Sequence, residues 1–264
     1  LHRAEAADRV ALHLGRAIER ALAAVPDKER LQVATSLARG VLDVVVRATE
    51  AGTVDFGVVP VENSTEGAVN RTLDLFLETS LAISGEVLVP VRQNLMSLGG
   101  TLEGVTRIVS HAQSLAQCIG WLDWNCPGIE RVPVASNAEA ARLASLDAAT
   151  AAIAGENAAA RYGLGLVARS IQDDPNNRTR FAVVGRYECA ATGADQTSLI
   201  LSVPDRAGAV HALIEPLARH GVSMKRFESR PARRGEWEYY FYIDILGHQG
   251  DPNVATALEE LRRN

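Results

Sequence analysis

This chain of 264 residues has little cysteine, no long apolar run and no excess of positive charge. Its three cysteines, Cys118, Cys126 and Cys189, are odd in number and lack the spacing of metal ligands. We therefore expect no disulfide framework and no metal site, and reduced thiols in a cytoplasmic protein. No apolar run approaches the ~18 residues that span a membrane, and no signal peptide is visible.

The charge balance argues against nucleic acid as a partner. The formal net charge is −5, and the sequence has no basic stripe that could follow a phosphate backbone. Hydrophobic residues make up 47% and charged residues 22% of the chain, which is ordinary for a soluble globular protein. The length allows one large or two to three small domains with an ample core.

The stretch 55–67 dominates the pattern. Residues 54–59 form a valine-rich run that predicts a buried strand, which we expect to end at Pro60. Glu62, Asn63 and Ser64 follow, ahead of apolar residues at helical spacing, so Ser64 or Thr65 is expected to cap a helix. A helix N-terminus beside a strand end can bind an anion. Taken alone, however, this stretch fits a capped turn with solvated polar residues better than an anion site.

Strands and helices alternate through the first two thirds of the chain. Amphipathic helices are predicted at 4–25 and from about residue 36 to Gly52. Further strands are predicted at 83–89, 95–98, 107–110, 132–135, 150–154 and 181–184, with a polar loop at 173–180. This alternation favours a mostly parallel sheet in two lobes with a cleft between them, as in periplasmic binding proteins.

The last part of the chain has a different organisation. Residues 187–196 are loose and rich in small side chains, which indicates a linker between domain 1–186 and domain 197–264. Strands at 197–203, 222–229 and 237–246 and helices at 209–220 and 252–263 follow in the order βαββα. That order is five-sixths of a ferredoxin-like α+β module.

Five short motifs, in register, carry a resemblance to a known family. Val-Pro-Val-Glu-Asn-Ser-Thr-Glu-Gly at 59–67, Ser-His-Ala-Gln-Ser-Leu-Ala-Gln-Cys at 110–118 and Asn-Arg-Thr-Arg-Phe at 177–181 resemble the signature segments of prephenate dehydratase. Gly-Ala-Val-His at 208–211 and Glu-Ser-Arg-Pro at 228–231 resemble the two phenylalanine-binding motifs of an ACT domain. The resemblance covers about residues 36–260. It is closest to the dehydratase and ACT regions of proteobacterial bifunctional chorismate mutase–prephenate dehydratases.

The resemblance implies loss of carbon dioxide and water from prephenate to give phenylpyruvate, without a metal or an organic cofactor. Thr179 would hydrogen-bond the leaving hydroxyl; the alternative is a loop threonine that caps the strand. Ser64 and Asn63 would bind substrate oxygens, and Glu62 would orient that network or act in a proton relay, or else lie behind it.

Further residues of the same motifs are candidates for substrate contact. Arg180 would clamp a carboxylate, or else neutralise Asp173 and Asp174 at the surface. Phe181 is expected to pack in the core of its strand, with its ring edge at the cleft. His111 and Gln113 follow a second strand end that could face the first, although a lone histidine is usually structural.

The ACT-like module is expected to bind L-phenylalanine as an effector. Gly208 allows close backbone approach at a helix N-terminus, so the first motif could hold an amino-acid carboxylate. The members of the two motifs are Gly208, Ala209, Val210 and His211, and Glu228, Ser229, Arg230 and Pro231. An ordinary turn and strand edge are the alternative. Because exposed strand edges tend to pair, a homodimer or homotetramer is expected.

Two departures from the family pattern are visible. The family's first strand and glycine-rich turn have no counterpart ahead of the first helix, and no chorismate mutase helices are present. The last strand of the ACT module is missing after Arg263. The gaps at the two ends fit a trimmed or incompletely recorded chain better than a different protein.

The leading hypothesis is thus a prephenate dehydratase of L-phenylalanine biosynthesis that L-phenylalanine inhibits. Arogenate dehydratase, which uses the same scaffold, is a close variant. A non-catalytic phenylalanine sensor and a two-lobed solute-binding protein are the competitors from other classes. The absence of a signal peptide and the appended ACT-like module count against the solute-binding protein.

Overall fold

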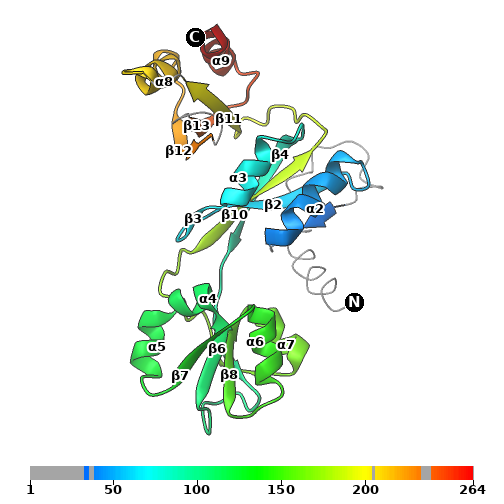
Figure 1. Ribbon diagram of the computed structural model, residues 1–264, viewed down its shortest axis with the longest axis vertical. Coiled ribbons are helices and arrows are strands. Elements are labelled where there is room, and N and C mark those ends of the chain that lie inside the picture. The colour runs from blue at the N-terminus through cyan, green and yellow to red at the C-terminus, as the bar shows by residue number, and fades with distance from the viewer. Residues whose placement is uncertain (1–32, 36–38, 204–205, 233–238, 264) are drawn as a thin grey trace. The chain divides into compact units, whose positions relative to one another are not determined.

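The computed structural model describes residues 33–35, 39–203, 206–232 and 239–263 (Figure 1). The helix predicted at 4–25 and the question of a strand ahead of it therefore lie outside the described residues. By its internal contacts the chain divides into two compact units. One holds residues 60–69 and 86–181, and the other holds the described residues of 20–59, 70–85 and 182–264.

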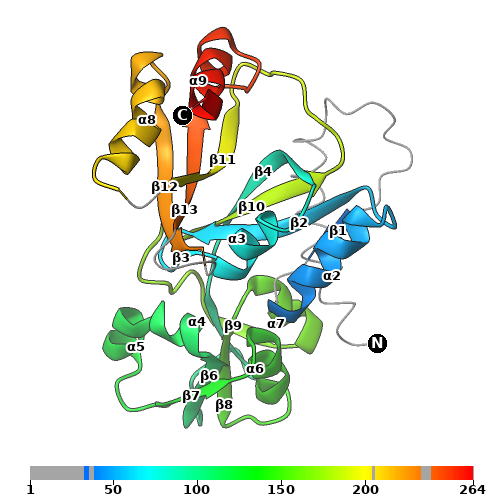
Figure 2. The same ribbon diagram turned by 45° about the horizontal axis from the view of Figure 1, so that its top comes forward.

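The first sheet has the strand order β1-β2-β10-β4 (Figure 2). These strands are β1 (Val33–Thr35), β2 (Phe56–Asn63), β10 (Arg178–Gly185) and β4 (Ala82–Pro90). β1 runs parallel to β2, and the short strand β3 (Gly67–Ala68) pairs antiparallel with the end of β2. The helices α2 (Arg39–Glu50) and α3 (Asn70–Phe76) precede and follow the β2–β3 hairpin.

The predicted end of the central strand at Pro60 is wrong. β2 continues through Pro60 to Asn63, and its burial is nearly complete along its length. Proline removes one backbone donor, but its fixed φ is compatible with extended backbone, so it does not by itself end a strand. The helix expected to begin at Ser64 or Thr65 is also wrong, because residues 64–66 form the turn of the β2–β3 hairpin. No helix N-terminus, and hence no helix-based anion site, lies at this turn.

The second sheet belongs to the unit that holds residues 86–181. Its order is β7-β6-β8-β5-β9, from β7 (Glu130–Val134), β6 (Arg107–His111), β8 (Thr150–Ala154), β5 (Asn94–Ser97) and β9 (Gly165–Ala168). β6 is parallel to β7 and β8, whereas β5 is antiparallel to β8 and β9. The sheet is thus mixed, because β5 enters it from the opposite direction.

Helices cover both faces of this second sheet. They are α4 (Ala112–Ala116), α5 (Ile119–Asn125), α6 (Asn137–Ala144) and α7 (Glu156–Tyr162). One core cluster contains Ile108 and Ile153 with Leu122, and the other contains Val109 and Ala152 with the alanines of α6. Neighbouring residues of a strand point to opposite faces, so the two clusters lie on the two sides of the sheet.

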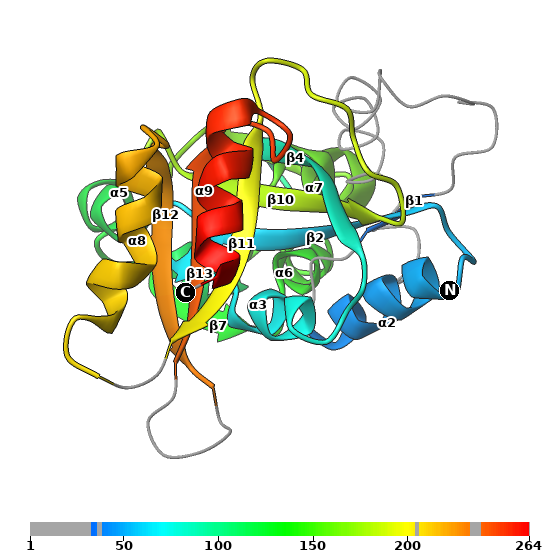
Figure 3. The ribbon, with the colours of Figure 1, turned by 90° about the horizontal axis from the view of Figure 1, so that it is seen from above.

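The C-terminal module follows the predicted order. It consists of β11 (Gln196–Val203), α8 (Ala209–Arg219), β12 (Met224–Pro231), β13 (Tyr239–Leu246) and α9 (Pro252–Arg263). The strands form an antiparallel sheet in the order β11-β13-β12. Both helices cover one face of it (Figure 3), where Leu217, Ile243 and Leu258 share a core. The linker at 187–196 stays a prediction.

Among the described residues, no helix has the length and apolar character needed to cross a membrane. The same residues contain no group of three or more acidic, histidine or cysteine side chains arranged to hold a metal ion.

Candidate functional site

Asn63, the last residue of β2, is the centre of a polar cluster that joins two of the predicted motifs. Its side chain is 9% exposed. Its Oδ1 accepts hydrogen bonds from the backbone N–H groups of Thr65 (3.0 Å) and Glu66 (3.1 Å), which closes the hairpin turn. Its Nδ2 donates to Asn177 Oδ1 (2.9 Å), to the carbonyl oxygen of Arg178 (3.3 Å) and to Thr179 Oγ1 (3.1 Å).

This contact constrains the hydroxyl group of Thr179. Because Thr179 Oγ1 accepts a hydrogen from Asn63, its own proton points elsewhere and is available for donation. Thr179 is half-buried, near the start of β10, which begins at Arg178 rather than at Phe181 as predicted. The threonine therefore sits on a strand instead of a loop, and its backbone is fixed by the sheet.

Ser64 ties the hairpin turn to β10. Its backbone N–H donates to the carbonyl oxygen of Arg178 (2.9 Å), and its Oγ accepts from the N–H of Arg178 (3.0 Å). Its hydroxyl hydrogen is left for another acceptor, because the oxygen acts here as an acceptor. Ser64 is exposed, so its hydroxyl can reach a ligand while its backbone holds the turn in place.

Arg180 and Phe181 follow Thr179 along β10. Arg180 lies beside Glu86 of β4, with Nε 3.6 Å from Oε2, and its side chain is 17% exposed. Asp173, which Arg180 was alternatively expected to neutralise together with Asp174, accepts from two backbone N–H groups of α5. Phe181 is 3% exposed and packs in the core as predicted.

Glu62 precedes Asn63 in β2 and is half-buried, opposite Ala68 of β3. Strand alternation directs its side chain to the other face of the hairpin from that of Asn63. Its position therefore favours the alternative in which Glu62 lies behind the polar network over the one in which it forms part of that network.

His111 and Gln113 lie at the end of β6 and in the first turn of α4, and both are exposed. His111 caps α4, since its Nδ1 accepts from the N–H of Gln113 at 3.4 Å. That hydrogen bond is long, so the imidazole can exchange this contact for another at small cost.

Sequence reasoning missed a buried polar network behind this second motif. Asn137 Oδ1 lies 3.0 Å from both Ser110 Oγ and Ser114 Oγ. Gln93 Nε2 donates to Ser114 Oγ (3.1 Å) and to Gln117 Oε1 (3.2 Å). Ser114 and Gln117 stand within the quoted motif, so their spacing on one helix face could have indicated a shared inward orientation.

The two ACT-like motifs lie at the start of α8 and along β12. Gly208 has φ +84°, a left-handed conformation that favours glycine, and forms the N-cap of α8. Ala209 is buried, and Val210 and His211 are exposed. Along β12, exposure alternates: Ser229 and Pro231 are exposed, whereas Glu228 and Arg230 are half-buried.

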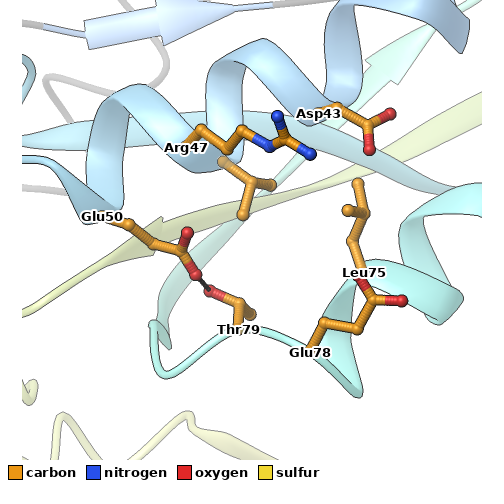
Figure 4. Close-up of a pocket in the computed structure, with 7 residues that line it drawn as sticks. Asp43, Arg47, Glu50, Leu75, Glu78 and Thr79 are labelled. Atoms are coloured by element: carbon orange, nitrogen blue, oxygen red, sulfur yellow. Dashed lines mark hydrogen bonds between the residues drawn. The ribbon is translucent and has the colours of Figure 1, made fainter.

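A shallow pocket between α2 and the end of α3 contains none of the predicted residues (Figure 4). Its polar lining includes Asp43, Glu50 and Glu78 around Arg47, and Thr79 Oγ1 donates to Glu50 at 2.6 Å. The pKa of Asp43 lies below its usual value because Arg71 hydrogen-bonds its carboxylate. Glu50 is thus partnered by Thr79 and Asp43 by Arg71, which gives the pocket a structural character.

Two family models match the chain, one after the other. A model described as prephenate dehydratase matches residues 23–189, and a model described as ACT domain matches residues 197–263.

Individual relatives extend the comparison. The bifunctional chorismate mutase/prephenate dehydratase of Neisseria gonorrhoeae is 50% identical over 231 residues, which are 86% of this chain and 64% of that protein. The chain thus spans less than two thirds of that relative's length. The prephenate dehydratase of Mycolicibacterium vanbaalenii is 36% identical over 244 residues, 90% of this chain and 78% of that protein.

A solved structure is similar as well. The prephenate dehydratase of Arthrobacter aurescens, in complex with L-Phe, has 37% sequence identity and a TM-score of 0.76. The match covers 84% of this chain and 75% of the other.

Proposed function

Because the chain belongs to the prephenate dehydratase family, we propose that it converts prephenate to phenylpyruvate, carbon dioxide and water. The observation that carries this proposal is the hydrogen bond from Asn63 to Thr179, which joins two family motifs and leaves the threonine proton for another acceptor. Relatives named for this activity support it, as does the matching prephenate dehydratase structure.

In the proposed reaction two bonds of the substrate ring break. The electrons of the bond to the departing carboxylate move into the ring, which becomes aromatic, and the bond to the ring hydroxyl breaks. The leaving oxygen accumulates negative charge and needs a proton donor to depart as water. The hydroxyl of Thr179, whose oxygen accepts from Asn63, donates a hydrogen bond to the leaving oxygen, and the proton that completes the water comes from solvent, so the threonine stays neutral. A positioned acid of this kind contributes about 10²–10⁴-fold in rate.

The remaining residues of the proposed site hold the dianionic substrate. The outward hydroxyl of Ser64 is a donor to a substrate oxygen, and Arg180 offers a guanidinium that can leave Glu86 for a carboxylate. Asn63 has both ends of its amide engaged within the protein, so we propose that it orients Thr179 more than it binds substrate. His111 and Gln113 are proposed to add contacts from the second motif.

For regulation, we propose that L-phenylalanine binds the module at 197–264, across the linker at 187–196. The left-handed Gly208 and the exposed Ser229 are positions where backbone and hydroxyl groups can meet an amino acid. The edges of β11 and β12 in the three-stranded sheet make a homodimer or homotetramer the proposed assembly, and the free thiols favour the cytoplasm.

Phenylpyruvate formation from prephenate at neutral pH, with and without L-phenylalanine, tests the proposal. Turnover that L-phenylalanine suppresses is the expected result. Turnover of arogenate but not of prephenate would identify the chain as an arogenate dehydratase instead. Binding of L-phenylalanine without turnover of either substrate would favour a sensor over an enzyme.

A further inference from the structure

Asn177 is the most deeply buried polar residue of the Asn63 cluster, with 1% of its surface exposed. Its backbone is held on both sides: its carbonyl oxygen accepts from the N–H of Val91 (2.8 Å), and its N–H donates to Asp174 O (3.3 Å). Its side chain meets Asn63, whose Nδ2 donates to Asn177 Oδ1 at 2.9 Å. Because the backbone of Asn177 is held in place, its side-chain oxygen accepts this hydrogen bond at a defined position.

The orientation of both amides follows from the hairpin turn. Two backbone N–H groups, which can only donate, contact Asn63 Oδ1, so the nitrogen of that amide must face β10. The atom of Asn177 that receives its hydrogen must then be the oxygen. Asn63 Nδ2 carries two hydrogens for three acceptors, so the hydrogen that Asn177 engages leaves the other one to Thr179 Oγ1 and the carbonyl oxygen of Arg178.

We propose that Asn177 is a positioning residue for the dehydration: it fixes the amide of Asn63 so that the hydroxyl of Thr179 directs its proton to the substrate. The inference rests on the proposed function and refines the same site. Asn177 itself is buried and does not touch substrate. It acts through Asn63, so its effect must disappear when the threonine hydroxyl is absent.

A double-mutant cycle on kcat tests this dependence. Asn177→Ala alone is expected to lower kcat about 10-fold or more and to change KM less than 3-fold. In a Thr179→Val background, the same substitution is expected to change the residual kcat less than 2-fold. An equal fractional loss in both backgrounds would overturn the inference, because it would mean that Asn177 only sustains the folded fraction.

The χ1 angle of Thr179 gives a readout that does not depend on turnover. Three-bond NMR couplings are expected to show one rotamer in the unsubstituted chain and rotamer averaging in Asn177→Ala. Retention of a single rotamer in that variant would overturn the positioning role even if prephenate proved not to be the substrate. Asn176→Ala, at the exposed neighbouring position, is the matched control and should leave both measurements unchanged.

A second observation, on the ACT-like sheet, concerns Arg230. Its Nη1 lies 2.8 Å from Asp74 Oδ1 and donates to the carbonyl oxygen of Asn70, so one guanidinium contacts both the start and the middle of α3. Beside it, the hydroxyl of Tyr242 donates to the carbonyl oxygen of Leu73 at 2.9 Å. The Arg230 side chain is 14% exposed, and Tyr242 is 4% exposed.

The register of the sheet separates the members of the second motif. Arg230 and Glu228 lie opposite Tyr240 and Tyr242, which share the face that contacts α3. Ser229 lies opposite Phe241, whose ring packs in the core with the helices on the other face. Successive side chains of a strand point to opposite faces, so Arg230 and Ser229 cannot line the same small pocket from one strand.

We infer that Arg230 couples the ACT-like module to α3 and is not a ligand of the effector. Helix α3 starts directly after Val69, whose N–H donates to Val61 of the strand that ends in Asn63. A change in β12 on effector binding is thereby passed to α3, the helix that follows the β2–β3 hairpin in the chain. This inference rests on the proposed regulation by L-phenylalanine.

Activity at saturating L-phenylalanine distinguishes a residue that transmits inhibition from a residue that binds the effector. In Arg230→Gln and Asp74→Asn, L-phenylalanine is expected to bind by calorimetry, while activity at saturation recovers to at least half of the uninhibited rate. Complete inhibition that merely requires more L-phenylalanine would overturn the inference. Arg219→Gln is the control, because it removes the ion pairs with Glu215 of α8 and Glu260 of α9, on the opposite face of the module.

Amide hydrogen exchange tests the contact without reference to activity. Exchange at residues 70–76 is expected to rise at least 5-fold in Arg230→Gln and to stay unchanged in Arg219→Gln. Unchanged exchange in the first variant would overturn the coupling role even if L-phenylalanine proved not to be the effector.

Discussion

Asn63 Nδ2 donates a hydrogen bond to Thr179 Oγ1 over 3.1 Å, although 116 positions separate the two residues. The contact exists because β2 and β10 are neighbours in the first sheet, so that the end of one strand meets the start of the other. Because the threonine oxygen accepts this hydrogen, its own proton is left for another acceptor.

Removing the Thr179 hydroxyl should abolish most of the turnover. Thr179→Val keeps the shape of the side chain, and we expect kcat to fall about 10²-fold or more because the leaving oxygen loses its donor. Thr179→Ser retains a hydroxyl and should keep a measurable part of the activity. Steady-state rates with prephenate, alongside circular dichroism, provide the measurement. Full activity of Thr179→Val would refute the site assignment.

The start of α5 should depend on Asp173. The carboxylate accepts from the backbone N–H groups of Gly120 and Trp121, each at 2.9 Å. Asp173→Ala leaves these donors to water and should lower the free energy of unfolding by about 1 kcal/mol. Urea denaturation measures the change. Asp173→Asn, which keeps one acceptor oxygen, should lose less; an equal loss would argue against capping.

Gly165 should not tolerate a side chain. A Cβ atom there would lie 2.5 Å from the Cα atom of Gly100, and backbone cannot rotate aside. We expect Gly165→Ala to destabilise the second sheet by about 1–3 kcal/mol, as other overpacked positions do. Thermal unfolding compared with Gly128→Ala, where the added atom meets open space, isolates the steric term. Equal stability of the two variants would contradict the close approach.

The buried thiols should resist modification in the native protein. Burial raises the pKa of Cys118 from 9.0 to about 12, and burial also raises the pKa of Cys126. At pH 8, a thiol-specific reagent should therefore label Cys189 first and the other two only after unfolding. Rapid labelling of all three thiols in the folded chain would contradict the described core.

The same shift predicts a dependence of stability on pH. A Cys118 pKa that is higher in the folded chain than in the unfolded chain means that the unfolded chain loses its proton first. The contribution of the Cys118 thiol to the free energy of unfolding is complete below about pH 9 and is lost as the pH rises toward about 12. Cys118→Ala should remove this part of the alkaline loss, which denaturant midpoints at pH 8 and pH 10 can measure.

Local patterns in the sequence determined much of this protein. The strand at 150–154 was predicted to the residue, because the apolar run and the residues that bound it lie within a few positions of each other. The βαββα order of the last module was equally visible. The five short motifs were enough to predict the family to which the chain belongs.

The tertiary structure alone decided which motif residues meet. Pro60 looked like a strand end, yet β2 runs through it because its neighbours on both sides bury it in the sheet. Ser64 looked like a helix cap, yet Asn63 satisfies the donors of that turn and Ser64 pairs with Arg178. Asp74 and Arg230 lie far apart in the sequence, and only the fold brings them into contact. Side-chain and backbone groups far apart in the chain compete for the same hydrogen bonds, and only the packed fold determines which partner each receives.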